Sequence, residues 1–190
     1  MFILKFLIRM AILPKNFYNR NTLRIAQDLL GCFLVRKING KIMKFKIVET
    51  EGYDGPKDLA SHASRGRTER NKVMFGEPGV IYVYFTYGMH YMLNIVTEKK
   101  EYPAAVLIRA LEFNGANGPA RLTKILKIDK FFNGLKIYTK KYGLWIEGRN
   151  EELKNSQIKK TTRVGVDYAG KYKDKKWRFY IKGNQFISKK

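Results

Sequence analysis

The clearest pattern of apolar and polar residues lies in the segment 41–56. Apolar side chains at positions 43, 45 and 47 alternate with polar ones, which is the period of a β-strand with one face toward a core. Glu49 and Glu51 continue the apolar face, where the strand runs out into a turn at Gly55-Pro56. Such a carboxylate is a solvated strand end, a partner for a buried arginine or a general base. The pattern alone favours the solvated end and leaves the other two readings open.

Periodicity, caps and turns predict the other elements of the fold. The predicted elements are a helix over residues 22–30, strands over residues 33–37, 41–48, 80–87, 104–111 and 178–182, and a helix that begins at Gly118-Pro119. Asn21 is a typical helix N-cap, and Asn39-Gly40 is typical of a type I′ hairpin turn. Strands joined by hairpins, with helices between them, predict an α+β fold: a single mixed domain whose antiparallel curved sheet carries hairpins and surrounding helices.

The length of 190 residues suits one domain with a core of its own. Residues 1–10 are apolar but too short to span a membrane, and they lack the small-residue cleavage site of a signal peptide. We expect residues 1–13 to form an N-terminal tail, with Met10 as an alternative start, ahead of a domain over residues 14–190. The lysine-rich stretch 171–176 is expected to be an exposed loop.

The charge of the chain indicates the class of its partner. Thirty-eight Lys and Arg against sixteen Asp and Glu give a net charge of +22, which favours a polyanion, either nucleic acid or an anionic membrane surface, over a mere lysine bias. Cys32 is the only cysteine, so the chain forms no internal disulfide, and a reducing interior is expected. With His62 and His90 as its only histidines, the chain is too poor in ligands for a zinc site of the usual type.

Two further features bear on chemistry. Arg109 lies in the apolar run 104–111, where its guanidinium needs a carboxylate or carbonyl partner; Glu51 and the adjacent Glu112 are the alternatives. The run Tyr82–Met89 presents tyrosines on both faces of a strand and ends in a glycine turn. Such tyrosines usually pack or decorate an edge, but in a basic protein they also serve as a stacking platform or wedge for bases.

Several motifs occur together in a recognisable order. They are Val48–Tyr53, Gly55-Pro56, Ser61-His62, Tyr82–Met89, Asn94, Leu107–Glu112, Asn117–Pro119 and Arg163–Gly170. With them the chain resembles the alkyladenine DNA glycosylase family, also called the 3-methyladenine DNA glycosylase family of the methylpurine type, over about residues 15–188.

The resemblance implies catalytic roles for two residues. Glu51 matches the general base that activates water for attack at the sugar C1′, and Arg109 matches the arginine that positions Glu51 and the water. The implied enzyme is a monofunctional DNA glycosylase of base excision repair, which hydrolyses the N-glycosidic bond and needs neither a metal nor an organic cofactor.

The resemblance also implies how the substrate is bound. The matched substrate-binding residues are Tyr53, His62, Tyr84, Met89 and Asn94. The first three match the aromatic walls around a flipped purine, and Asn94 matches the asparagine that disfavours the amino group of guanine. Tyr87 matches the residue that is inserted into the gap the flipped nucleotide leaves. Met92 and His90-Tyr91 depart from the family pattern and affect the breadth of substrates.

The implied partner is double-stranded DNA with damaged purines: 3-methyladenine, 7-methylguanine, hypoxanthine or ethenoadenine. We expect a monomer that does not bind membranes and is cytoplasmic, acting on nucleoid DNA in a bacterial-type cell, or nuclear in a eukaryote. The alternatives are a non-catalytic nucleic-acid-binding protein, which would not require Glu51 and Arg109 to meet, and an acyl or formyl transferase, for which the chain shows neither nucleophile nor cofactor loop.

Overall fold

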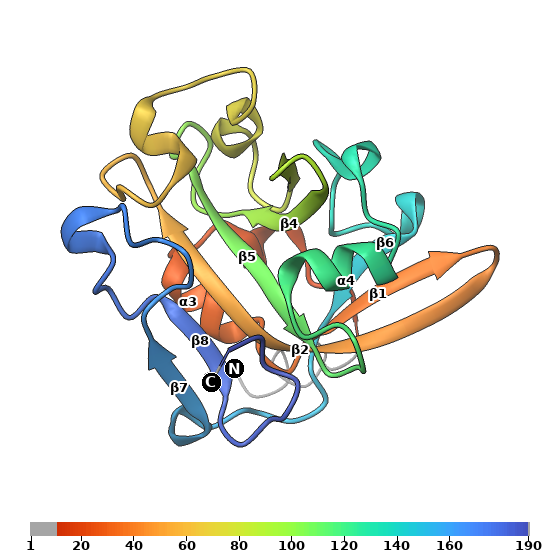
Figure 1. The fold of residues 1–190 in the computed structure, drawn as a ribbon. Coiled ribbons are helices and arrows are strands. Elements are labelled where there is room, and N and C mark those ends of the chain that lie inside the picture. Colours follow the sequence, from red (N-terminus) through yellow and green to blue (C-terminus); the bar gives the residue numbers. More distant parts are fainter. Residues whose placement is uncertain (1–10, 190) are drawn as a thin grey trace.

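Eight antiparallel strands form one sheet in the computed structural model, which describes residues 11–189 (Figure 1). The strands are β1 (Phe33–Ile38), β2 (Lys41–Asp54), β3 (Ile81–Thr86), β4 (His90–Val96), β5 (Ala104–Leu111), β6 (Leu144–Glu147), β7 (Ile158–Thr161) and β8 (Arg178–Ile181). Six of them follow the order β3-β4-β5-β2-β1-β6, and β8 pairs with both β2 and β7. The described residues thus confirm the predicted α+β domain with an antiparallel sheet.

Short helices pack on both faces of the sheet, with α3 behind β2 and α4 in front in Figure 1. The α-helices are α2 (Lys15–Tyr18), α3 (Thr22–Asp28) and α4 (Pro119–Ile125), and the 3₁₀ helices are His62–Arg65, Lys72–Phe75, Lys130–Phe132, Lys140–Tyr142, Asn155–Gln157 and Gly170–Tyr172. Asn21 caps α3 as predicted, because its side chain accepts a hydrogen bond from the Arg24 amide. Helix α4 begins with proline at its first position, also as predicted.

Strand β2 is the longest strand, and it is longer than the alternation pattern predicted. The prediction ended the strand at Val48, but pairing continues to Asp54 because β5 and β8 both bond to this half of β2. The face opposite Glu49 and Glu51 is also buried, since helix α3 covers it and the Thr50 hydroxyl donates to the carbonyl of Ala26. The two carboxylates therefore lie inside the sheet rather than at a solvated strand end.

The turn between β1 and β2 forms where the sequence predicts it. Asn39 and Gly40 both have positive φ angles, of 50° and 78°, as a type I′ turn requires. Three strands were not predicted. Strand β4 contains His90 and Asn94 and is buried over most of its length, so it lacks a simple alternation, and β6 and β7 have only four residues each.

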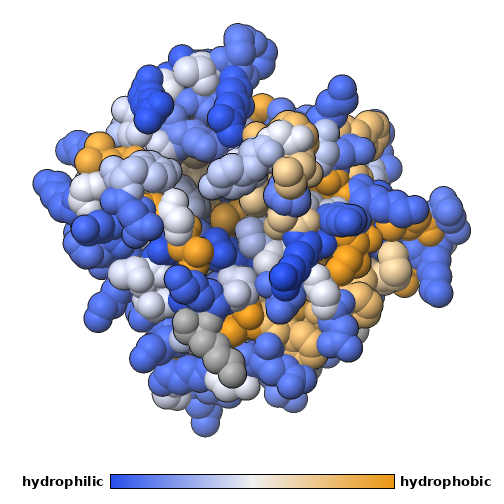
Figure 2. Space-filling view, viewed as in Figure 1, coloured by the Kyte–Doolittle hydropathy of each residue, from blue (hydrophilic) through white to orange (hydrophobic). Residues whose placement is uncertain are grey.

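The described part of the predicted tail packs on the domain. Ile12 bridges to Glu147 of β6, and Leu13 is buried in the core. The rest of the predicted tail, including Met10 as an alternative start, lies outside the described residues. Within residues 11–189 no helix is long and apolar enough to cross a membrane. Figure 2 shows mostly hydrophilic side chains on the visible face, with apolar ones gathered along the β1–β2 hairpin.

Candidate active site

A cavity of about 320 Å³ lies against β3, β4, β5 and the C-terminal half of β2. Aromatic side chains and a few polar groups line it, and the segment 164–168 closes one side. The predicted site residues among its lining are Tyr53, His62, Tyr84, Tyr87, Asn94 and Arg109. The fold thus brings six of the eight predicted residues together, from segments as far apart in the sequence as β2 and β5.

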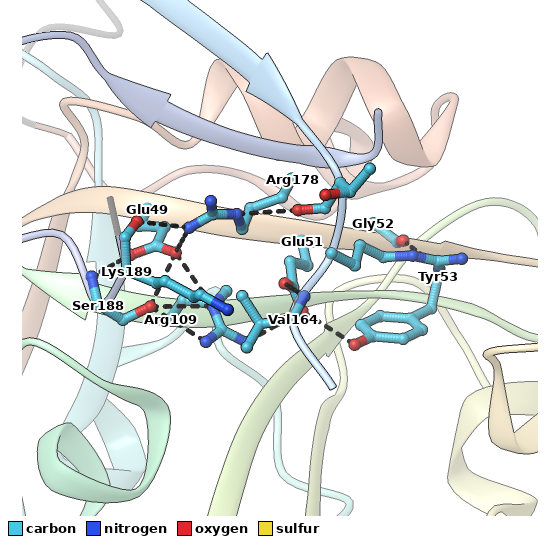
Figure 3. A network of polar contacts seen from close by, with 11 residues as sticks. Glu49, Glu51, Gly52, Tyr53, Arg109, Val164, Arg178, Ser188 and Lys189 are labelled. Atoms are coloured by element: carbon cyan, nitrogen blue, oxygen red, sulfur yellow. Dashed lines mark hydrogen bonds and ion pairs between the residues drawn. The ribbon is translucent and has the colours of Figure 1, made fainter. Parts of the chain in front are cut away.

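Glu51 lies directly behind the cavity wall and has 0% exposed surface. Its Oε2 accepts hydrogen bonds from the Tyr53 hydroxyl (2.9 Å) and from Nη1 of Arg109 (3.2 Å). Its Oε1 accepts one from the backbone amide of Val164 (2.8 Å), as Figure 3 shows. All three donor residues line the cavity, so the carboxylate is separated from the cavity only by the groups that hold it.

Arg109 joins the two carboxylates of β2. Register shifts flank Glu49, and Arg109 stands on β5 between the partners of Glu49 and Thr50, which brings its guanidinium within reach of both glutamates. Its Nε donates to Glu49 Oε1 at 3.1 Å, and its Nη1 reaches Glu51. Burial lowers the pKa of Arg109, but the neighbouring Glu51 and Glu49 outweigh it and the pKa is raised. Of the two predicted alternatives Glu51 is the partner; Glu112 pairs with Lys46 instead.

Tyr53 forms one wall of the cavity, and a buried ion pair supports it from behind. The guanidinium of Arg163 stacks on the Tyr53 ring at 4.8 Å and on Trp177 at 5.0 Å. Arg163 also makes two hydrogen bonds to Asp58, at 2.6 and 2.8 Å, and both side chains are fully buried. Burial and the Glu51 carboxylate raise the pKa of Tyr53 well above its usual value, so its hydroxyl stays protonated and donates to Glu51.

His62 and Tyr84 lie together in the lining of the cavity. Their rings meet edge to face at 4.5 Å, and His62 Nδ1 is hydrogen-bonded to the Tyr82 hydroxyl at 2.9 Å. Burial, together with the nearby cations Arg70 and Arg65, lowers the pKa of His62 from 6.5 to about 4. The imidazole is therefore neutral at neutral pH and adds no positive charge to the cavity.

The depressed pKa of His62 predicts a loss of stability in mild acid. A neutral histidine in the folded state favours folding above pH 6.5, and this contribution is lost as the pH falls toward 4, because only the unfolded chain then takes up the proton. The loss amounts to about 3 kcal/mol at most. In His62→Gln the fall of the unfolding free energy between pH 6.5 and 4 should be shallower, measured by urea denaturation. His90→Gln is the control, and an equal change in both variants would contradict the prediction.

Asn94 lies on β4 at the floor of the cavity. Its side-chain amide donates to the backbone carbonyls of Tyr82 (3.2 Å) and Met92 (3.3 Å). Two bonds to the backbone fix the orientation of the amide group, so Asn94 presents a rigid polar group to a ligand. Its role in substrate binding stays a prediction.

Tyr87 and Met89 form the tip of the β3–β4 hairpin. Tyr87 is 82% exposed and Met89 is 67% exposed. Tyr87 borders the cavity, whereas Met89 is not among its lining residues, so the structure separates Met89 from the predicted pocket. Tyr87 has a φ of 53°, in the left-handed region, and Gly88 follows with 67°. A bulky residue in this conformation is strained, by about 1–3 kcal/mol, and such strain clusters at functional sites.

Sequence reasoning missed three contributors to this site. Tyr168 lines the cavity and is 68% exposed, and its motif Arg163–Gly170 was noted without a role for it. The buried ion pair of Asp58 and Arg163 was not predicted either, although their opposite charges were a signal that the two residues could pair. Val164 contributes a backbone amide, which no side-chain pattern can reveal. Among the described residues no cluster of three or more His, Cys, Asp or Glu could hold a metal ion.

Comparison with known proteins identifies the family. The model of the family described as Methylpurine-DNA glycosylase (MPG) matches residues 16–185.

The chain belongs to the methylpurine-DNA glycosylase family.

Relatives that carry the words "3-methyladenine DNA glycosylase" in their names match over 98–100% of their own length. One from Carboxydothermus hydrogenoformans is 46% identical over 196 residues, covering 94% of this chain and 100% of the relative. One from Methanocella arvoryzae is 43% identical, covering 95% and 98%, and one from Clostridium perfringens is 40% identical, covering 94% and 99%. These matches confirm the predicted family and class of enzyme, a DNA glycosylase that hydrolyses an N-glycosyl bond.

Proposed function

We propose that this methylpurine-DNA glycosylase removes alkylated or deaminated purines from double-stranded DNA, acting as a monomer and leaving an abasic site. The lesions are those that the resemblance implies: 3-methyladenine, 7-methylguanine, hypoxanthine and ethenoadenine. The observation that carries the proposal is the buried pair of Glu51 and Arg109 behind an aromatic cavity. A non-catalytic nucleic-acid-binding protein would have no use for a carboxylate held in this way.

The cavity suits a single flipped base. Its volume of about 320 Å³ falls in the usual range of small-molecule sites, about 300–1,000 Å³. Tyr53, His62 and Tyr84 offer aromatic faces and edges for stacking. Several alkylated purines carry a positive charge, and a cation between aromatic rings gains roughly 0.5–2 kcal/mol. Neutral His62 does not repel such a base.

Extrusion of the nucleotide is the step in which Tyr87 would act. A base inside a duplex hides its glycosidic bond, so the nucleotide has to leave the stack at a cost of a few kcal/mol. An exposed tyrosine on the rim of the cavity can fill the gap and offset part of this cost. The exposed position of Tyr87 at the tip of the β3–β4 hairpin supports this role.

Hydrolysis then requires one water at Glu51. A carboxylate accepts about four hydrogen bonds, and three acceptor positions of Glu51 are occupied by Tyr53, Arg109 and Val164. A water that enters between these residues meets the remaining one. Glu51 takes a proton from the water while the water oxygen bonds to C1′. The bond from C1′ to the base nitrogen breaks, and its electron pair leaves with the base. Arg109 orients the carboxylate through its ion pair with Oε2.

The proposed function is tested with a duplex that carries one hypoxanthine. Incubation with the protein, followed by heat or alkali, should reveal strand breaks at the lesion and none in an undamaged duplex. A duplex with 7-methylguanine tests an alkylated base, scored by release of the free base against a sample without protein. The catalytic position holds a carboxylate rather than an amine, so borohydride should trap no covalent complex. No excision from either duplex, or trapping in good yield, would contradict the proposal.

The wedge role of Tyr87 makes a separate prediction. Tyr87→Ala should weaken binding to lesion DNA and slow excision, because nothing fills the stack after extrusion. The salt dependence of binding should stay unchanged, since its slope counts displaced counterions, about 0.9 for each phosphate contact, and tyrosine displaces none. Salt titrations of the parent and variant on lesion and undamaged duplexes measure both effects. A changed slope with unaltered lesion discrimination would make Tyr87 part of the backbone-contacting surface instead.

A further inference from the structure

The segment that ends the described chain folds back onto the carboxylate next to the proposed general base. Ser188 donates to Glu49 twice, from its backbone amide to Oε2 and from its hydroxyl to Oε1. The next residue, Lys189, accepts a hydrogen bond from Arg178 through its backbone carbonyl, at 2.9 Å. Figure 3 shows both residues beside Glu49 and Arg109, on the far side of the cluster from Tyr53. This contact joins residues 139 positions apart in the chain.

The Ser188 hydroxyl uses all of its hydrogen-bonding capacity in this cluster. It accepts from Nε of Arg109 at 3.3 Å and from Nη2 of Arg109 at 3.0 Å. Guanidinium nitrogens cannot accept a hydrogen bond, so the hydroxyl proton is directed to Glu49, at 2.9 Å. One hydroxyl thus links the guanidinium to the carboxylate that supports it.

These bonds fix the direction in which Arg109 points. Glu49 and Ser188 hold the edge of the guanidinium that carries Nε and Nη2. The guanidinium is planar, so fixing this edge aims the remaining nitrogen, Nη1, at Glu51. Among the nitrogens of Arg109, only Nε donates a hydrogen bond to Glu49. Without Ser188, no hydrogen bond at Nη2 would oppose rotation of the guanidinium. Ser188 supplies the second point of attachment.

We infer that Ser188 is a positioning residue for the reaction. The inference rests on the proposed function: Ser188 holds Arg109 in place, so that Glu51 and its water have the reactive geometry. Ser188 is uncharged, and the charges of Glu49, Glu51, Arg109 and Arg178 balance without it. Loss of its hydroxyl therefore disturbs the position of Arg109 and leaves the charge of the cluster as it was. Binding of the lesion, which depends on the aromatic walls on the other side, is not involved.

The test compares three variants of the full chain with the parent protein on the hypoxanthine duplex. Ser188→Ala removes the hydroxyl, and Ser188→Thr keeps it. Lys189→Ala is the matched control, because Lys189 contributes only its backbone carbonyl to the cluster. Single-turnover excision rates and lesion-DNA affinities are measured well below the unfolding temperature of each variant, which a thermal melt defines.

In Ser188→Ala the excision rate should fall about 10-fold to 10²-fold, as expected when a reacting group is misplaced by a fraction of an ångström to one ångström. Lesion affinity should stay within about twofold, and Ser188→Thr and Lys189→Ala should excise at close to the parent rate. A rate in Ser188→Ala within about threefold of the parent would overturn the inference. The inference would also be overturned if the excision rate fell equally in Ser188→Thr and lesion binding weakened, because these results mark a purely structural role. A parent protein without excision activity would refute the proposed function itself, and this inference with it.

Discussion

Glu51→Gln should abolish base excision while leaving binding to lesion DNA nearly intact. Glutamine keeps the shape of the side chain and an oxygen acceptor, but it cannot take a proton from water at neutral pH. Loss of a general base costs about 10²–10⁴-fold in rate. Glu51 lies behind the cavity rather than in its lining, so the surface that meets the base is unchanged. Single-turnover excision and equilibrium binding on the same duplex separate the two effects.

Glu112→Gln is the matched control for this prediction. It makes the same chemical change at a carboxylate that forms an ion pair with Lys46, at 2.7 Å, and that is not part of the cavity lining. Excision by Glu112→Gln should equal that of the parent protein. Excision by Glu51→Gln within about threefold of the parent, a difference of roughly 0.7 kcal/mol in barrier height, would rule out the assignment of Glu51.

The second large effect concerns stability. Arg163→Met should lower the free energy of unfolding by about 3–5 kcal/mol, because it leaves Asp58 as a buried carboxylate without its ionic partner. Both side chains have no exposed surface, so water does not screen their interaction. The variant should also bind lesion DNA more weakly, since the ring of Tyr53 loses the guanidinium stacked behind it. Urea denaturation measures the stability, with affinity measured on the same preparations.

A double variant tests the cause of this loss. Asp58→Asn keeps an oxygen for the backbone amide of Ala60 and removes the charge. Combined with Arg163→Met, it should recover part of the lost stability, because no uncompensated charge then remains buried. Losses that simply add in the double variant would show that the two residues contribute independently and that the ion pair is not the source.

The local elements of this protein follow from short-range signals in its sequence. The Asn21 cap, the Asn39-Gly40 turn and the Gly118-Pro119 helix start all depend on residues within a few positions of one another, and each forms where it was predicted. Strand β5 was predicted with its observed boundaries, because a strand buried on both faces is apolar at nearly every position, here at all but Arg109. Strand β7 was not predicted, because it has only four residues and just one of them is buried.

The resemblance to the family also depended on the sequence alone, and the matched family model confirms it. It assigned roles to residues whose individual patterns were weak, such as His62, which otherwise reads as an ordinary surface or core histidine. Six of the eight residues line one cavity, and their roles stay predictions. Met89 is not one of the six, since the hairpin carries it to an exposed tip outside the lining.

Only the tertiary structure decided which charges meet. Strand β2 continues past Val48 because β5 and β8 pair with it, and this pairing buries the two glutamates that alternation alone placed at a solvated end. The shifted register beside Glu49 then brings Arg109 to both carboxylates, while Ser188 and Val164 arrive from distant segments. Register shifts and backbone donors leave no periodic trace in a sequence. The residue types of the site were therefore readable from the chain, whereas their mutual geometry depended on contacts between segments far apart along it.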